Sequence, residues 1–251
     1  MRIDERKVLK LENIISEILP LTADTSQFNR VFIPIEHDFS LELANENNLN
    51  IYHLRTENRR FKYEDLTNFC VGNLSQYIFN RKTVKQAKSQ ADIQILYNRG
   101  RKQLREVRNE NDSGAGGELG ELLLYLFLEN CLHAPKLLSK MEIKTTRNQY
   151  IYGADGLHLY MTKDKYGNML YQFVIGEAKI KNDILDATRV AFDSIRKSID
   201  EIDIETALVS EEILKEVCTK EDAEKLIEVI LPSEDIADKF TTSEKACLLY
   251  T

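Results

Sequence analysis

The feature that most constrains the fold is residues 171–180, Tyr-Gln-Phe-Val-Ile-Gly-Glu-Ala-Lys-Ile, an apolar run typical of a central strand. Side chains of a strand alternate between two faces, so Glu177 and Lys179 share one face while Ala178 and Ile180 take the other. Burying a charge is costly unless another group compensates it. This strand end therefore either lies in water or belongs to a site that uses both charges.

The composition indicates an ordinary globular protein. The 251 residues suffice for one large domain or a core with an appended subdomain, and 43% are hydrophobic. No apolar run approaches the roughly 20 residues of a membrane helix, and the charged N-terminus is unlike a signal peptide. We therefore expect a cytoplasmic protein. The four cysteines and four histidines are scattered, which argues against disulfides and a zinc site.

The charge distribution is uneven beneath a net charge of −7. Basic residues outnumber acidic ones by 13 to 5 over residues 52–108, whereas acidic residues lead by 18 to 8 over residues 183–251. Residues 81–108 are predicted to form one long helix that is rich in Lys, Arg and Gln. A solvated face or a protein-contact surface is the simpler interpretation, and a path for a phosphate backbone is the alternative.

Residues 118–131 predict a buried helix, because they are apolar on all sides after the first turn. Glu118 and Glu121 are three residues apart and lie on one side of that first turn. Acidic residues at a helix N-terminus also suit the helix dipole, so these two glutamates need no further role to be explained.

A hairpin is predicted around the opening strand. Gly153-Ala-Asp-Gly156 leads into a strand over residues 157–161, residues 163–168 form a turn, and residues 169–180 return. In an antiparallel pair Asp155 and Glu177 then lie at the same end of the sheet. An Asp beside Gly is also common turn chemistry, which is the alternative for Asp155.

The remaining pattern predicts an α/β protein in two parts. Residues 111–117 are the clearest break and divide an N-terminal α+β region, 1–110, from a core with a mixed sheet flanked by helices, 111–251. The other expected helices are 3–19, ended by Pro20, 63–79 and 183–199. The other expected strands are 30–35, 50–55, 141–145, 204–209, 226–231 and 246–251.

The carboxylates predict a metal site. Asp155 and Glu177 could together bind a hard divalent cation such as Mg²⁺, completed by Glu118 or Glu121. Three carboxylates close together repel one another unless a cation neutralises them. Such a metal generates hydroxide and stabilises charge on a scissile phosphate, while Lys179 orients the water or contacts the phosphate. The sequence therefore predicts a metal-dependent phosphodiesterase.

Three motifs carry a family resemblance: Gly117-Glu-Leu-Gly-Glu121, Gly153-Ala-Asp-Gly156 and Gly176-Glu-Ala-Lys179. In this order they resemble the PD-(D/E)xK nuclease superfamily, with Ala154 where the superfamily name has proline. More narrowly, the chain resembles the nuclease subunits of the two-component Hachiman anti-phage defence system. The resemblance covers residues 114–200 in its motifs and extends more weakly along most of the chain.

The resemblance implies a restriction-endonuclease-like core that hydrolyses DNA in the bacterial cytoplasm. It implies Mg²⁺, with Mn²⁺ able to substitute, held by Asp155, Glu177 and Glu121, with Lys179 and Glu118 as further catalytic residues. It also implies a heterodimer with a superfamily 2 helicase, whose engagement of phage or damaged DNA releases the nuclease from restraint.

Two other functions stay open. The chain could be an inactive scaffold of the same fold that docks a helicase or nucleic acid. The presence of Asp155, Glu177 and Lys179 counts against a site that has lost its catalytic activity. It could also cleave RNA, because metal-ion hydrolysis of a phosphodiester needs no 2′-hydroxyl and the sequence does not separate the two substrates.

Overall fold

The computed structural model describes residues 17–38, 49–110, 117–139, 156–163, 169–200, 221 and 242–250. These belong to two compact units, Asp24–Asn73 and the combination of Met1–Ala23 with Leu74–Thr251. The predicted division at residue 110 stays a prediction. The predicted strands 141–145, 204–209 and 226–231 and most of the predicted helix 3–19 lie outside the described residues. Within them, no helix is long and apolar enough to cross a membrane.

The smaller unit is an α+β unit built on a cluster of aromatic rings. Phe28 contacts the rings of Phe32, Tyr52 and Phe69 at centroid distances of 5.1, 5.9 and 6.1 Å. These rings come from α2 (Phe28–Val31), β1 (Phe32–Ile35), β2 (Ile51–Leu54) and α3 (Tyr63–Ile78). A short hairpin joins β2 to α3 through β3 (Thr56–Glu57) and β4 (Arg60–Phe61). The predicted strands and helix of this region are confirmed with shorter bounds.

The prediction of one long helix over residues 81–108 is wrong, because the chain forms two helices in this range. They are α4 (Arg81–Gln86) and α5 (Gln90–Glu110). The second helix starts with a reciprocal cap: the Ser89 backbone N–H donates to the Asp92 carboxylate at 3.0 Å, and the Asp92 N–H donates to Ser89 Oγ at 3.1 Å. Such a cap satisfies backbone donors that a helix start leaves without intrahelical partners, so it favours a new helix over continuation.

The larger unit contains a four-stranded mixed sheet in the order β5-β6-β7-β8. Its strands are β5 (Lys136–Ser139), β6 (Gly156–Lys163), β7 (Met169–Lys179) and β8 (Thr242–Tyr250). The predicted hairpin is confirmed, since β6 and β7 pair antiparallel with Gly156 opposite Gly176. Strand β8 runs parallel to β7 and begins before the predicted strand 246–251. Strand β5 was not predicted.

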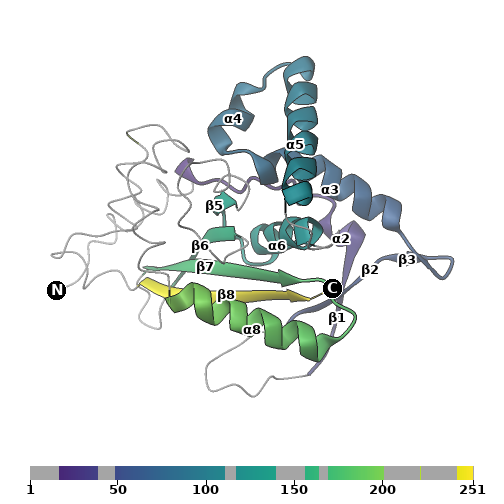
Figure 1. Cartoon of the computed structure of the whole chain (residues 1–251), viewed down its shortest axis with the longest axis vertical. Coiled ribbons are helices and arrows are strands. Elements are labelled where there is room, and N and C mark those ends of the chain that lie inside the picture. Colours follow the sequence, from purple (N-terminus) through teal and green to yellow (C-terminus); the bar gives the residue numbers. More distant parts are fainter. Residues whose placement is uncertain are drawn as a thin grey trace. The chain divides into compact units, whose positions relative to one another are not determined.

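Two helices flank the sheet, and Figure 1 shows β7 and β8 running between α6 (Gly117–Cys131) and α8 (Ile184–Asp200). Leu124 and Leu128 of α6 form a buried cluster with Ala134 and Val174. The approach of α6 depends on a glycine in β7, because a Cβ at Gly176 would lie 2.6 Å from Cδ2 of Leu124. The expected burial of α6 is confirmed, with Leu126 and Leu128 fully inaccessible to solvent.

We predict that Gly176→Ala destabilises the protein by about 1–3 kcal/mol, because the added methyl overpacks a fully buried contact. Leu124 is 1% exposed and has little space into which to move. Urea denaturation followed by circular dichroism measures the loss.

Gly72→Ala provides the matched control, since Gly72 lies within α3 and a Cβ there meets nothing within 4 Å. Alanine exceeds glycine in helix propensity, so this variant should gain about 1 kcal/mol. If Gly176→Ala were as stable as the wild type, the close approach of α6 to β7 would be incorrect.

Candidate functional site

The two charges of the opening motif form an ion pair at the end of β7. Lys179 Nζ donates to Glu177 Oε1, which confirms that both side chains share one face of the strand. Glu177 is only 3% exposed, whereas the Lys179 side chain retains 22% of its surface. The carboxylate is therefore buried, with its charge compensated by a lysine that reaches solvent.

The opposite face of this strand end packs on α6. A Cβ at Gly120 would lie 3.3 Å from the Cβ of Ala178. Because neighbouring strand residues point to opposite faces, Glu177 and Lys179 leave the sheet on the face away from α6. A site that combined Glu177 with a residue of α6 would have to form around the edge of β7.

The described pairing of β6 with one edge of β7 ends before the end of β7. The register stops at Gly156 opposite Gly176, while β7 continues to Lys179 with β8 along its other edge. Asp155 lies outside the described residues and directly precedes Gly156 in the chain. Continuing the register by one position would set Asp155 opposite Glu177, which is the predicted pairing of the two carboxylates and stays a prediction.

The two glutamates of α6 differ in their surroundings. Glu121 is 7% exposed, and its Oε2 accepts a hydrogen bond from the Tyr77 hydroxyl at 2.9 Å. Glu118 is half-buried. Glu121 shares a side of the helix with Tyr125 and Glu129, which follow at intervals of four residues. The structure thus gives Glu121 a defined hydrogen-bond donor, and its predicted part in a metal site stays a prediction.

The described residues include one part of the predicted metal site. Among them, no three His, Cys, Asp or Glu side chains gather closely enough to hold a metal ion. Glu177 offers a carboxylate, the ligand type that Mg²⁺ prefers, and Lys179 offers a cation suited to a phosphate. The donor chemistry at this strand end fits Mg²⁺, and a second carboxylate from Asp155 would be needed to hold the ion.

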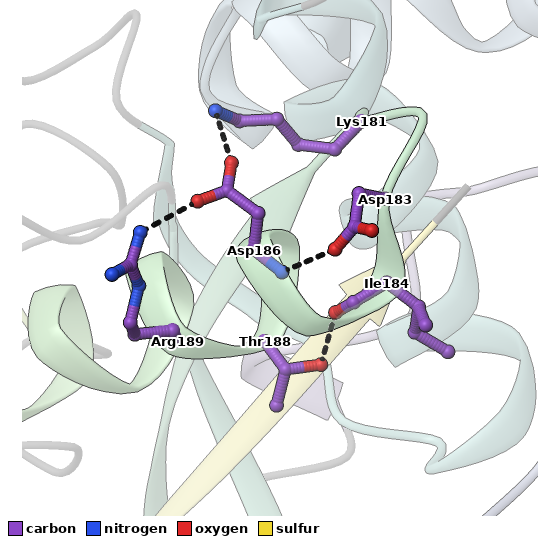
Figure 2. A network of polar contacts seen from close by, with 6 residues as sticks. All are labelled: Lys181, Asp183, Ile184, Asp186, Thr188 and Arg189. Atoms are coloured by element: carbon purple, nitrogen blue, oxygen red, sulfur yellow. Dashed lines mark hydrogen bonds and ion pairs between the residues drawn. The ribbon is translucent and has the colours of Figure 1, made fainter.

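Two further acids close to this strand end are accounted for by the start of α8 (Figure 2). Asp183 caps the helix by accepting the Asp186 N–H at 2.8 Å. The Asp186 carboxylate accepts from Arg189 at 2.9 Å and from Lys181 at 3.2 Å. Hydrogen bonds from these two cations lower the pKa of Asp186 below its ordinary value. These acids therefore fix the turn that follows β7.

A buried carboxylate that the sequence did not reveal organises the other side of α6. Glu129 is fully buried and accepts four hydrogen bonds, from the backbone N–H groups of Thr22 (2.5 Å), Ala23 (2.6 Å) and Lys136 (2.9 Å) and from the Thr22 hydroxyl (2.9 Å). Four donors are enough to satisfy both oxygens of a carboxylate group. Glu129 thus ties the segment before the smaller unit to α6 and β5.

A buried lysine completes the arrangement. Lys136 is 1% exposed, and its Nζ donates to the carbonyls of Gln76, Tyr77 and Phe79 at 2.9, 3.1 and 3.2 Å. These carbonyls lie at the C-terminal end of α3, where the helix dipole favours a cation. Nothing in the local sequence distinguishes Lys136 from a surface lysine, because its partners are about 60 residues away in the chain.

The same buried region holds a histidine in its neutral form. His158 is 1% exposed, and its Nδ1 donates to the Ala134 carbonyl at 2.8 Å. Burial lowers the pKa of His158 from 6.5 to about 4, because the charged imidazole would lose its hydration. The Ala134 carbonyl and Glu129 oppose this shift, whereas Lys136 and Arg81 add to it.

His158 predicts a loss of stability in mild acid. As the pH falls from 6.5 towards 4, the unfolded chain binds a proton at this histidine while the folded protein does not. The free energy of unfolding should therefore fall over that range, by on the order of 3 kcal/mol from this one group. Urea denaturation at a series of pH values measures the slope.

Replacing His158 by Gln should flatten this pH dependence, because glutamine can still donate to the Ala134 carbonyl and does not titrate. The control is His133→Asn, at an exposed histidine with a φ of 50° that asparagine tolerates. It should leave the slope intact. An unchanged slope in His158→Gln would contradict the neutral, buried imidazole.

Comparisons with known proteins place the chain in a family. Comparison with curated proteins and with solved structures finds no match. A family model described as HamA matches residues 28–249, which span both compact units and the whole β7 motif. The chain therefore belongs to the HamA family. This membership agrees with the resemblance to a component of Hachiman anti-phage defence.

Proposed function

Taking the chain as a member of the HamA family, we propose that it is a metal-dependent nuclease that hydrolyses phosphodiester bonds of DNA in anti-phage defence. The observation that carries this proposal is the pair of buried Glu177 and half-buried Lys179 at the end of β7. A hydrophobic pair of similar volume would hold a strand equally well or better, because two charges lose hydration on burial. Retaining the charges therefore favours a chemical role.

The roles follow from position and charge. Glu177 and Asp155 would hold Mg²⁺ or Mn²⁺, and Glu121 or Glu118 would reach the ion around the edge of β7. When bound, the metal supplies a hydroxide at neutral pH and neutralises charge on the phosphate. Lys179 then turns from Glu177 towards a phosphate oxygen or the attacking water. Its partial exposure gives it the freedom to do so.

The arrangement of elements supports a restriction-endonuclease-like core. Buried helix α6 precedes the β6–β7 hairpin, α8 follows it, and β8 returns parallel to β7. The acidic helix start, the strand that Asp155 precedes in the chain and the strand with Glu177 thus stand in the order that the PD-(D/E)xK resemblance implies. The further parts of the proposal, a superfamily 2 helicase partner and a cytoplasmic location, rest on that resemblance.

An inactive scaffold is the second candidate, favoured by a specific observation. Lys179 compensates the charge of Glu177 without a metal, and among the described residues no three potential ligands gather. A protein whose ion pair is only structural would dock DNA or a helicase without cleaving DNA.

The test is the double substitution Glu177→Gln, Lys179→Met. It removes both charges together and leaves neither buried alone, so the melting temperature should stay unchanged or rise. Mg²⁺-dependent cleavage of DNA should fall by about 100-fold or more, because electrostatic stabilisation of the reacting phosphate is lost. Gel analysis of a labelled duplex and single strand, with the helicase partner present, measures the rate.

Lys181→Ala is the matched control, since it removes a lysine two residues beyond Lys179 that pairs with Asp186 (Figure 2). Cleavage should persist in this variant. Cleavage that survives in the double variant refutes the site. A wild-type protein that cleaves neither DNA nor RNA with Mg²⁺ and partner present would favour the scaffold.

A further inference from the structure

A strongly basic surface lies apart from β7, on the α4–α5 hairpin. Residues 82–102 contain six cationic side chains and one acidic side chain, in a chain of net charge −7. All six cations are exposed: Lys82, Lys85, Lys88, Arg99, Arg101 and Lys102. A local excess of this kind attracts polyanions even when the whole protein is acidic.

One side of α5 is buried and the other side is exposed. Leu96 and Gly100 face inwards, and a Cβ at Gly100 would lie 3.1 Å from Cδ1 of Ile78 at the end of α3. The opposite side carries Gln94, Asn98 and Lys102 at four-residue intervals, all exposed. Figure 1 shows α4 and α5 in blue beside the end of α3. From Gln94 to Lys102 this exposed side thus offers two amides and a cation.

Two of the arginines are held in place by aromatic rings. The Arg99 guanidinium lies 5.4 Å from the ring centroid of Phe79, and that of Arg101 lies 5.8 Å from the ring centroid of Tyr97. Such contacts restrain a flexible side chain while leaving its N–H groups exposed. A restrained guanidinium loses less entropy when it forms paired hydrogen bonds with a phosphate.

The one acidic residue among residues 82–102 opposes a polyanion little. Asp92 lies in the first turn of α5, where it accepts from Ser89 Oγ at 2.7 Å. Asp92 thus caps the start of the helix, and the hydrogen bonds from Ser89 lower the pKa of its carboxyl below the ordinary value. Its charge is balanced in part by the positive end of the helix dipole.

We propose that the α4–α5 hairpin binds the phosphate backbone of the polynucleotide that the β7 site cleaves, which rests on the proposed function. Phosphates are the favoured occupant because exposed cations and amides dominate the surface, and contacts of this kind position a nucleic acid without reading its sequence. The exposed Ile93 and Ile95 at the start of α5 are the feature that a protein partner would use instead.

The test measures binding without cleavage. Fluorescence anisotropy of a labelled DNA duplex is recorded in EDTA over a range of salt concentrations, with the full chain. The variant Arg99→Glu, Lys102→Glu should bind at least about 10-fold more weakly at low salt. Its slope of log affinity against log salt should be shallower by about one for each phosphate contact removed.

The matched control is Arg196→Glu, Lys197→Glu, which makes the same charge change at two exposed positions of α8. It should leave affinity and salt slope close to those of the wild type. Equal losses of DNA affinity in the two variants would overturn the proposal, because the change in net charge alone would explain both losses. Unchanged binding in the hairpin variant would overturn it as well and would assign the surface to a protein partner.

Failure of the proposal for the α4–α5 hairpin and failure of the nuclease proposal are distinguishable. The variant Glu177→Gln, Lys179→Met should keep most of the duplex affinity in EDTA, with a salt slope shallower by at most the one contact of Lys179, because the hairpin is intact. A wild-type protein that cleaves DNA while the hairpin variant keeps full affinity refutes only the hairpin. Salt-dependent binding through the hairpin without any metal-dependent cleavage refutes only the nuclease.

Discussion

The buried carboxylate of Glu129 is the interaction on which the arrangement of the larger unit depends. It accepts four hydrogen bonds, three from residues 22–23, which are more than 100 residues away in the chain, and one from the backbone of Lys136, seven residues away. The Lys136 ammonium in turn holds the last carbonyls of α3. Removing one partner of a buried charged network costs about 3–5 kcal/mol, so these bonds hold α6, β5 and the end of α3 together as one assembly.

This assembly fixes where the candidate site can form. Polar contacts hold one side of α6, and on another side Gly120 and Gly176 let the helix approach β7 closely. Strand β7 therefore has one face committed to α6, and its charged residues project from the other. The chemistry proposed for Glu177 and Lys179 thus depends on a rigid strand end, which is the support that a metal and a phosphate require.

The β6–β7 hairpin was predictable because its sequence signals are local. The turn predicted over residues 163–168 and the apolar residues 169–180 indicated two paired strands, and the structure pairs them with Gly156 opposite Gly176. The break between α4 and α5 was missed, although Ser89 and Asp92 have the spacing of a capping box. The roles of Lys136 and Tyr77 could not be predicted from the sequence, because their hydrogen-bond partners are distant in the chain. Asp155 and the strand 141–145 lie outside the described residues.

The central claim is that Asp155 joins Glu177 in holding a metal ion beside Lys179. Electron paramagnetic resonance of Mn²⁺ added to the full chain reports bound metal without any need for substrate or cleavage. The account predicts that the wild type binds Mn²⁺, that Asp155→Asn loses this binding, and that Asp186→Asn keeps it because Asp186 belongs to the start of α8. Equal Mn²⁺ binding by the wild type and Asp155→Asn would contradict the account.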